Sequence, residues 1–219
     1  MSRVADIQAG TASTNEAAFA DYVADRTIAC VAPGPISDDE HELIRQHDLI
    51  YIVAGHTSHH RIRPDIVFLN RHGINRLMKG RQQYDGYDWI VTKSAPHDLP
   101  NARKARYGNN VNLNQVPIVL EDLAHFRPAD VNVYGADLYY AGPGASYLDV
   151  YDNRPVERQY RGIISHRPTL QHEYLRRIWQ ETGWLGRSDR LRQVLEMDTD
   201  DYYRCLRAKW VPSAVGVAA

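Results

Sequence analysis

The chain has 219 residues, of which 43% are hydrophobic and 24% charged, and its formal net charge at pH 7 is −1. This composition is that of an ordinary globular protein, and the length suits one well-buried domain. A charge so close to zero leaves no basic surplus for nucleic acid, so the sequence argues against a nucleic-acid binder.

The two cysteines, Cys30 and Cys205, are too few for a disulfide framework and form no C-x-x-C pair. No stretch approaches the roughly 18 apolar residues of a membrane span, and the N-terminus lacks the charged-then-apolar profile of a signal peptide. We therefore expect a cytoplasmic protein that associates with membranes at most peripherally.

Short apolar runs in much of the chain have the length of buried strands. Strands are expected at 27–32, 48–55, 64–70, 88–93 and 130–140, and residues 162–164 are expected to end a further strand. Helices are expected at 16–24, 38–46, 73–80, 116–126, 168–179 and 188–209. Ser37, with Glu40 three residues later, has the pattern of a capping box. Residues 94–115 and 141–159 are expected to be irregular.

Strands that alternate with helices predict an α/β fold, here a single Rossmann-like domain with a mainly parallel sheet, flanking helices and a small lid-like irregular segment. The domain is expected at 27–210, after an N-terminal extension at 1–26 and before a C-terminal tail at 211–219. Open sheets of this kind bind ligands at the carboxyl ends of their strands. The positions at those ends are Pro33–Pro35, Gly55–His60, Asn70, Lys93–Ser94, Gly135–Tyr140 and Ser165–His166.

His166 is expected between the strand end at 162–164 and the helix that follows Pro168. The partial positive charge at a helix N-terminus disfavours the imidazolium, so a histidine there tends to stay neutral and able to accept a proton. Such a ring suits a general base that activates a hydroxyl nucleophile. The simpler alternative is a histidine that caps its own helix.

Gly34 lies between two prolines after the first strand, where a tight turn and a ligand-contacting loop are equally compatible with the sequence. Neither G-x-G-x-x-G nor G-x-x-x-x-G-K-[ST] occurs, which argues against a nicotinamide enzyme and a P-loop NTPase. The lack of G-x-S-x-G argues against a serine hydrolase.

Two further segments carry polar candidates. The segment "HTSHH", with His56, His59 and His60, follows a strand and has no acidic neighbour, so we expect a polar or substrate-facing loop there and no metal. The tyrosines of "GADLYYAGPGASYLD" can hydrogen-bond a phosphate without adding charge, although packing under a loop is the simpler role.

Taken together, "PDIVFLN", "VNVYGADLYYAGPGASYLD" and "YRGIISH" leading into a helix make residues 27–182 resemble the bacterial sialyltransferases of glycosyltransferase family 42. The chain is more distantly similar to the animal-type sialyltransferases, in which His-Pro-x-x-x-Glu opens a helix; "HRPTLQ" here has Gln171 at the acidic position. The resemblance implies a Rossmann-like sheet with a small lid, a CMP-activated sugar-acid donor, and neither a metal nor another cofactor in the chemistry.

By this resemblance His166 is the general base, and Tyr139 with Tyr147 hydrogen-bonds the departing phosphate. Direct attack by the acceptor hydroxyl would invert the anomeric centre. The candidate substrate-binding positions are Ala32, Pro33, Gly34, Pro35, Gly55, His56, Asn70, Asn114, Gly135, Asp137 and Ser165.

Ala32-Pro33-Gly34 stands where the family has Gly-Asn-Gly, so the identity of the sugar and of the nucleotide stays open. The expected partners are a nucleotide-sugar donor and a glycan or small-molecule acceptor, and a homo-oligomer is compatible with the sequence. Two alternatives remain. One is a nucleotide or nucleotide-sugar hydrolase, or an N-glycosidase, on the same scaffold, and the other is a binding module without activity.

Overall fold

The computed structural model describes residues 15–53, 62–78, 86–93, 101–108, 113–143, 155–183 and 185–211. Its strands are β1 (Thr27–Val31), β2 (Leu49–Val53), β3 (Ile66–Leu69), β4 (Trp89–Thr92), β5 (Ala102–Lys104), β6 (Asp130–Tyr134) and β7 (Leu185–Arg187). They form one seven-stranded sheet in the order β5-β4-β3-β2-β1-β6-β7, and every neighbouring pair is parallel. The predicted α/β fold with a parallel sheet is confirmed.

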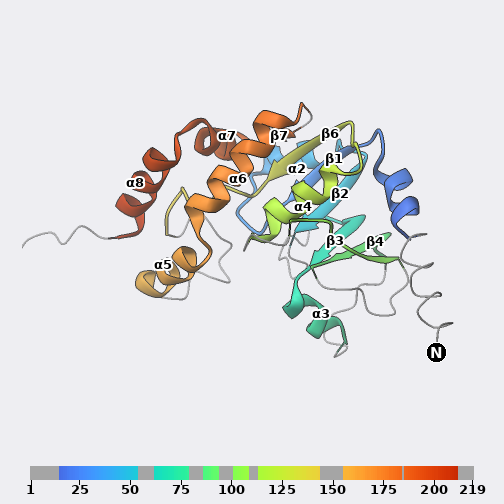
Figure 1. Cartoon of the computed structure of the whole chain (residues 1–219), viewed down its shortest axis with the longest axis horizontal. Helices are drawn as coiled ribbons and strands as arrows, with labels where there is room; N and C mark the ends of the chain where they lie inside the picture. The colour runs from blue at the N-terminus through green and yellow to red at the C-terminus, as the bar shows by residue number, and fades with distance from the viewer. Residues whose placement is uncertain are drawn as a thin grey trace, which may run out of the picture.

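The helices lie on both faces of this sheet and at one of its ends (Figure 1). They are α2 (Asp38–Ile44), α3 (Arg71–Met78), α4 (Gln115–Ala124), α5 (Val156–Ser165), α6 (Pro168–Glu181), α7 (Asp189–Glu196) and α8 (Thr199–Trp210). Residues 15–23 are also helical, as expected. None of the helices within the described ranges is both long and apolar enough to cross a bilayer.

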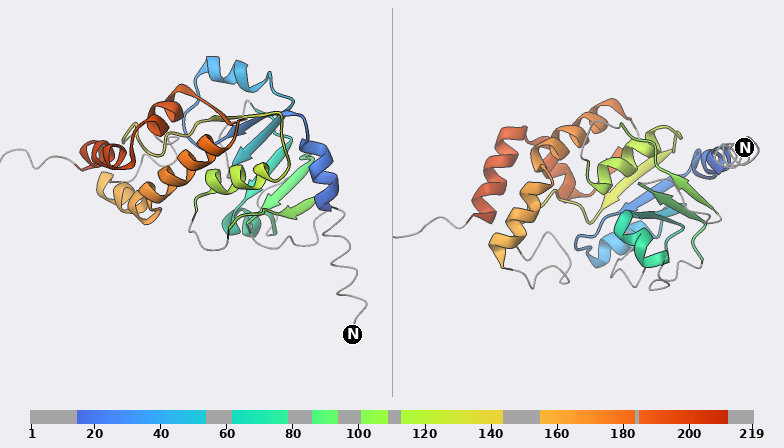
Figure 2. Two further views of the ribbon diagram at one scale, coloured as in Figure 1. Left: turned by 45° about the horizontal axis from the view of Figure 1, so that its top comes forward. Right: turned by 60° about the horizontal axis from the view of Figure 1, so that its bottom comes forward.

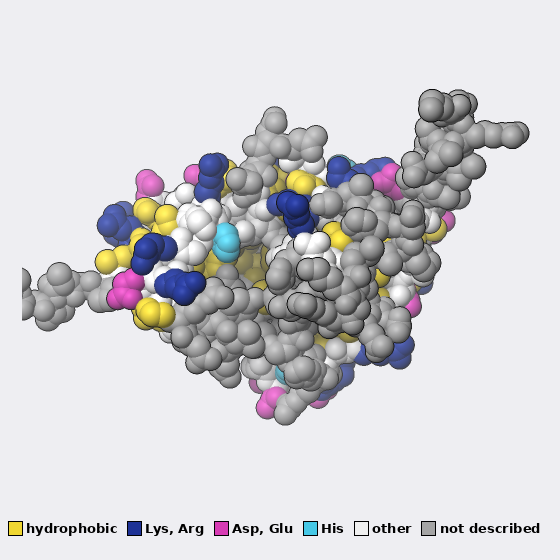
Figure 3. All heavy atoms as spheres, turned by 90° about the horizontal axis from the view of Figure 1, so that it is seen from below, with side chains coloured by type: hydrophobic (Ala, Val, Ile, Leu, Met, Phe, Trp, Pro, Cys, Tyr) yellow, Lys and Arg dark blue, Asp and Glu magenta, His cyan; other side chains and the backbone are white. Residues whose placement is uncertain are grey.

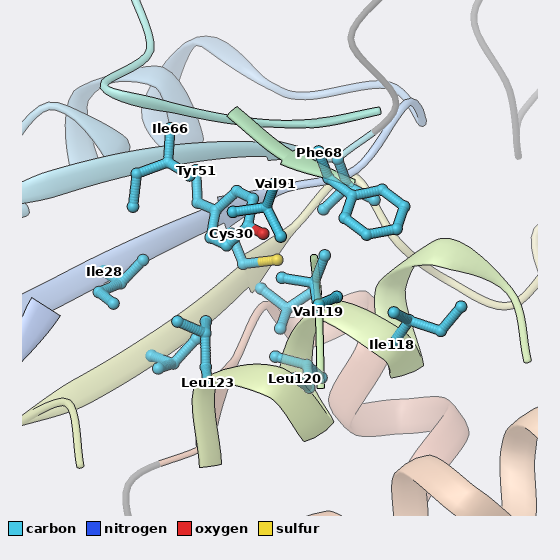
Figure 4. Close-up of a cluster of buried hydrophobic side chains, with 14 of the residues drawn as sticks. Ile28, Cys30, Tyr51, Ile66, Phe68, Val91, Ile118, Val119, Leu120 and Leu123 are labelled. Atoms are coloured by element: carbon cyan, nitrogen blue, oxygen red, sulfur yellow. The ribbon is translucent and has the colours of Figure 1, made fainter. Parts of the chain in front are cut away.

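The central strands are apolar at nearly every position because helices cover both faces of the sheet. Ile28 and Cys30 of β1 belong to the large core cluster with Leu120 of α4, which Figure 4 shows in close-up. Their neighbour Ala29 belongs instead to the cluster that contains Ile44 of α2. Side chains on a strand alternate between the two faces, so one continuous apolar run fills both cores.

The start of α2 has the cap that the sequence predicts. Ser37 caps α2: its Oγ accepts from the backbone N–H of Glu40 at 3.2 Å, and the Glu40 carboxylate accepts from the Ser37 N–H at 2.9 Å. This confirms the capping box.

In the helical segment at 15–23, Phe19 and Val23 are fully buried in the core cluster of the sheet. Part of the expected N-terminal extension therefore packs on the domain.

The prediction of a strand end at 162–164 is wrong, because these residues lie in α5. Val156, Tyr160 and Ile163 recur at helical spacing, and all three pack in the cluster formed with α8. A run of three apolar residues fits a strand or a helix equally well, and here the packing partner decides. The same helix begins inside 141–159, which was expected to be irregular.

Other differences concern short elements and boundaries. The segment 94–115 was expected to be a loop but contains β5, and β7 was not predicted; each has three residues, too few to show a period. The strand expected at 130–140 ends at Tyr134. The single helix expected at 188–209 is two helices, since the chain turns at Met197 and Asp198 caps α8 by accepting from the Asp201 N–H at 2.8 Å.

The second half of the molecule is a group of helices beside the β6–β7 side of the sheet (Figure 2). A cluster that we call the helical cluster joins α5, α7 and α8 to the turn after β6. Its buried members are Tyr139, Ile163, Val194, Tyr202, Leu206 and Trp210. This cluster places a residue of the sheet's carboxyl edge among the C-terminal helices.

Candidate active site

The sheet has a topological switch point at β1, whose neighbours are β2 on one side and β6 on the other. In open parallel sheets, ligands bind in the crevice outside the carboxyl ends of the strands at such a point. The chain after β1 and the chain after β6 are joined there by two hydrogen bonds. Ala32 N–H donates to the Tyr134 carbonyl at 2.9 Å, and Gly34 N–H donates to the Gly135 carbonyl at 2.8 Å.

Gly135 is required at this crossing. Its φ is +63°, a left-handed conformation that L side chains rarely adopt. A Cβ at this position would lie 2.7 Å from the carbonyl oxygen of Ala32 and 2.9 Å from that of Gly34. The two strand ends can therefore approach this closely only with glycine.

The turn at Ala32–Pro35 has no free backbone donor for a phosphate. The N–H groups of Ala32 and Gly34 bond to the chain after β6, and the two prolines have none. This restricts the role expected for the turn, which can contact a ligand through its carbonyls and its side chains. A phosphate at the switch point would need a donor from elsewhere.

The turn that follows β6 is organised by Asp137. Its carboxylate is buried and accepts from the backbone N–H of Tyr139 at 2.8 Å and from that of Ala141 at 2.9 Å. Leu138 and Tyr139 have φ values of +50° and +68°, so two consecutive non-glycine residues are left-handed. Asp137, one of the expected substrate-binding positions, holds this turn.

The structure brings Tyr139 and His166 together. The Tyr139 hydroxyl lies 2.9 Å from Nδ1 of His166, and Nδ2 of Asn114 donates to the same hydroxyl at 3.2 Å. Tyr139 comes from the turn after β6, Asn114 caps the start of α4, and His166 closes α5. Three of the positions expected from the sequence thus meet around one phenol oxygen.

Gln171 is a site residue whose part in this network sequence reasoning missed. It is fully buried in α6, and its Oε1 accepts from the backbone N–H of Asn114 at 2.9 Å. Its Nε2 donates to the carbonyl of His166 at 3.2 Å. One amide side chain therefore fixes the backbones of Asn114 and His166, which both bond to the Tyr139 hydroxyl. The available signal was its place in "HRPTLQ", five residues after His166 near the start of the following helix.

The interruption between helices α5 and α6, at His166 and Arg167, has a local cause. Pro168 is the first residue of α6 and disfavours the right-handed helical conformation at Arg167, which has φ +51°. His166 therefore lies between two helices, not between a strand and a helix as expected. It closes the negative end of α5 and precedes the positive end of α6, so the two helix ends act on its charge in opposite directions.

The electrostatic setting of His166 still favours the neutral ring. The residue as a whole is exposed, but the atoms packed around it remove part of the water from the imidazole. This partial burial lowers the pKa of His166 below its ordinary value. Partial burial thus acts toward the neutral ring that the sequence predicts, whereas the two helix ends oppose each other.

The remaining predicted positions are more dispersed. Asn70 follows β3, two strands from β1, and its Oδ1 accepts from the Gly73 N–H at 2.9 Å at the start of α3. Ser165 is exposed, and its hydroxyl donates to the Gly162 carbonyl at 2.6 Å. Gly55, His56 and Tyr147 lie outside the described residues, as do His59 and His60.

Figure 3 shows this side of the molecule from below, with a hollow in which hydrophobic side chains are visible and lysines and arginines around it. The basic side chains gather toward the end formed by α5 and α8. The exposed cations of these elements and of the α5–α6 junction are Arg158, Arg161, Arg167, Arg204, Arg207 and Lys209. Such a surface lowers the electrostatic cost of bringing an anionic ligand to this face.

Within the described ranges, no group of three or more His, Cys, Asp and Glu side chains is placed to hold a metal ion. Comparisons of the chain with protein-family models, with curated proteins and with solved structures gave no match. The site is therefore interpreted from its own geometry.

Proposed function

We propose that this protein is a glycosyltransferase of the sialyltransferase-like type, which transfers a sugar, a sialic or related ulosonic acid, from a CMP-activated donor to an acceptor hydroxyl. His166 is the general base and Tyr139 stabilises the departing phosphate, with Tyr147 as its expected partner. The observation that carries the proposal is the 2.9 Å contact between the Tyr139 hydroxyl and His166 Nδ1.

The hydrogen bonds around Tyr139 fit these two roles. A phenol oxygen has one proton to donate and two lone pairs. If the proton of the neutral imidazole is on Nδ1, the phenol accepts from His166 and from Asn114 and uses both lone pairs on the protein. In this tautomer the phenol is the donor that we assign to a phosphate oxygen, and Nε2 of His166 accepts the proton of the nucleophile. We assign this tautomer.

The transfer balances with these groups. Nε2 of His166 takes the proton of the acceptor hydroxyl as its oxygen attacks the anomeric carbon. The bond from that carbon to the phosphate oxygen breaks, and its electron pair leaves with the nucleotide. The phenol of Tyr139 donates to the phosphate as its charge develops. A positioned base and a positioned donor each contribute on the order of 10²-fold or more to the rate.

The position of the pair supports a nucleotide at the switch point. Tyr139 is five residues beyond β6, in the segment whose Gly135 bonds to Gly34 of the turn Ala32–Pro35. The N–H groups of that turn are all used or absent. A neutral phenol can supply the donor that this turn lacks. Helices α5 and α8 carry five cations and three carboxylates (Glu157, Asp200 and Asp201), and this small positive excess suits a phosphate-bearing ligand.

A hydrolase on the same scaffold is the second candidate. His166 is exposed, so water can reach the base in place of an acceptor hydroxyl. Nucleotide-sugar hydrolysis would then use the same base and the same leaving-group donor. The two functions differ in the nucleophile that reaches His166, which is an acceptor hydroxyl in a transferase and water in a hydrolase.

The test is an incubation of the full chain with CMP-linked sialic acid and other nucleotide sugars, with and without a panel of glycan acceptors. Release of CMP and transfer to acceptor are followed by mass spectrometry. We expect acceptor-dependent transfer, lost by at least about 10²-fold in His166→Ala. Tyr87→Phe, far along the sheet, serves as the control and should keep the wild-type rate.

Other results would contradict the proposal. Hydrolysis that no acceptor diverts would favour the hydrolase. Binding of a nucleotide without turnover, unchanged in His166→Ala, would indicate a binding module. Wild-type turnover in His166→Ala would show that the site has been misplaced.

A further inference from the structure

Two side chains of α8 hold the backbone of the turn that carries Tyr139. Nε1 of Trp210 donates to the carbonyl of Tyr139 at 2.7 Å, across 71 positions of sequence. The hydroxyl of Tyr202 donates to the carbonyl of Leu138 at 2.7 Å, across 64 positions. Both donors come from the last described helix and reach adjacent peptide groups.

The peptide groups that they hold are in an unfavourable conformation. Leu138 and Tyr139 both have positive φ, a conformation that L-residues other than glycine rarely adopt because Cβ approaches the following carbonyl oxygen. Asp137 fixes the N–H side of the turn, through Tyr139 and Ala141, and within the turn the Gly142 N–H donates to the Tyr139 carbonyl at 3.3 Å. The conformation persists because groups outside the turn hold its carbonyl side as well.

Both donor side chains are buried, and each directs its polar hydrogen at the turn. Trp210 is 1% exposed and Tyr202 is 0% exposed. An indole has a single N–H, and that of Trp210 is used on Tyr139. Tyr202 also stacks on His172, with ring centroids 4.5 Å apart. Its ring is thereby fixed and its hydroxyl is directed at the turn.

We propose that Trp210 and Tyr202 are positioning residues: by holding the carbonyls of Leu138 and Tyr139 they fix the left-handed turn that directs the phenol of Tyr139 to His166. Their effect on turnover rests on the proposed function, whereas their effect on the Tyr139–His166 contact does not. The C-terminal helix is then part of the reaction centre's framework, although neither residue touches a substrate.

The test replaces each donor by phenylalanine, which keeps an aromatic ring and removes the donated proton. Trp210→Phe and Tyr202→Phe are compared with the reference variant Tyr139→Phe. Tyr203→Phe is the matched control, because it makes the same change one residue along α8, where the hydroxyl bonds Tyr160 and not the turn. Thermal melting confirms that each variant is folded.

The decisive measurement is the NMR titration of the His166 ring, labelled with ¹³C and ¹⁵N, which reports its pKa and tautomer. We expect Trp210→Phe and Tyr202→Phe to move this titration toward that of Tyr139→Phe, and Tyr203→Phe to leave it unchanged. Turnover of the CMP-sugar should fall by about 10-fold to 10²-fold through kcat, with little change in KM.

A role in packing alone would lower the melting temperature without moving the His166 titration, and that result would overturn the inference. If Trp210→Phe does not fold, Tyr202→Phe decides by the same criterion. If the titration moves but the wild-type protein turns over no nucleotide sugar, the positioning role stands and the proposed function fails.

Discussion

The hydroxyl of Tyr139 and Nδ1 of His166 are 2.9 Å apart, although 27 positions separate the two residues in the chain. One belongs to a left-handed turn after a central strand and the other to a two-residue joint between helices. Local preferences of neither segment bring them together. The contact is made by the way the C-terminal helices pack against the carboxyl edge of the sheet.

Tyr139→Phe should lower kcat by about 10²-fold with little change in KM, because the phenolic proton is needed as the phosphate departs and the ring still packs. Tyr140→Phe is the matched control. The ammonium group of Lys209 lies over the ring of Tyr140, and phenylalanine at position 140 keeps this contact. Steady-state kinetics on the nucleotide sugar measures both. Equal rates in the two variants would remove Tyr139 from the mechanism.

The acid limb of the pH–rate profile should lie below the ordinary histidine value of about 6.5. Partial burial lowers the pKa of His166, so the ring stays neutral, and able to accept a proton, to a lower pH than a free histidine. The profile of kcat/KM and the NMR titration of the ring should give the same midpoint. A midpoint above that value would contradict the assignment of His166 as the base.

The same shift has a consequence for stability. The unfolded chain binds a proton at the ordinary pKa, whereas folded His166 binds it only at lower pH. The free energy of unfolding contributed by this group is therefore present above the unfolded pKa and lost as the pH falls through the folded pKa. Denaturant unfolding measured across this range should show a shallower pH dependence in His166→Gln.

Gly135→Ala should destabilise the protein by at least about 2 kcal/mol, because a left-handed alanine is unfavourable and its Cβ would meet two backbone carbonyls. Gly162→Ala is the control. Nothing lies within 4 Å of a Cβ added there, in the helix α5, so this change should stabilise by about 0.5–1 kcal/mol. Urea unfolding compares the two. Equal stability would mean that the two strand ends can separate without cost.

Arg103→Met should destabilise the protein by about 3–5 kcal/mol, since it removes the cation from the buried carboxylate of Asp122, which keeps the Arg106 N–H at 2.6 Å. The guanidinium makes two bonds to that carboxylate, at 2.6 and 2.8 Å, and stacks between Phe19 and Phe126. Arg106→Met breaks a half-exposed pair with Glu16 and should cost at most about 1 kcal/mol. If both variants lose a similar free energy of unfolding, burial of the Arg103–Asp122 pair does not increase its contribution to stability.

The sequence predicted most of the architecture because the central strands are short, continuous apolar runs that alternate with helical patterns, and the helix at Ser37 has a local cap. It also singled out His166, Tyr139 and Asn114. Residues whose roles depend on distant contacts could not be predicted in the same way. Trp210 and Tyr202 resemble ordinary core aromatics of an amphipathic helix, and only the fold shows that their polar atoms reach the turn after β6.

The strand β7 adds a constraint on how this protein can move. It comes between α6 and α7 in the chain and pairs with β6, with Val131 opposite Leu185. The strand β7 therefore attaches the group of C-terminal helices to the sheet between α6 and α7, in addition to the covalent connection that precedes α5. They cannot swing outward on a single hinge without detaching an edge strand.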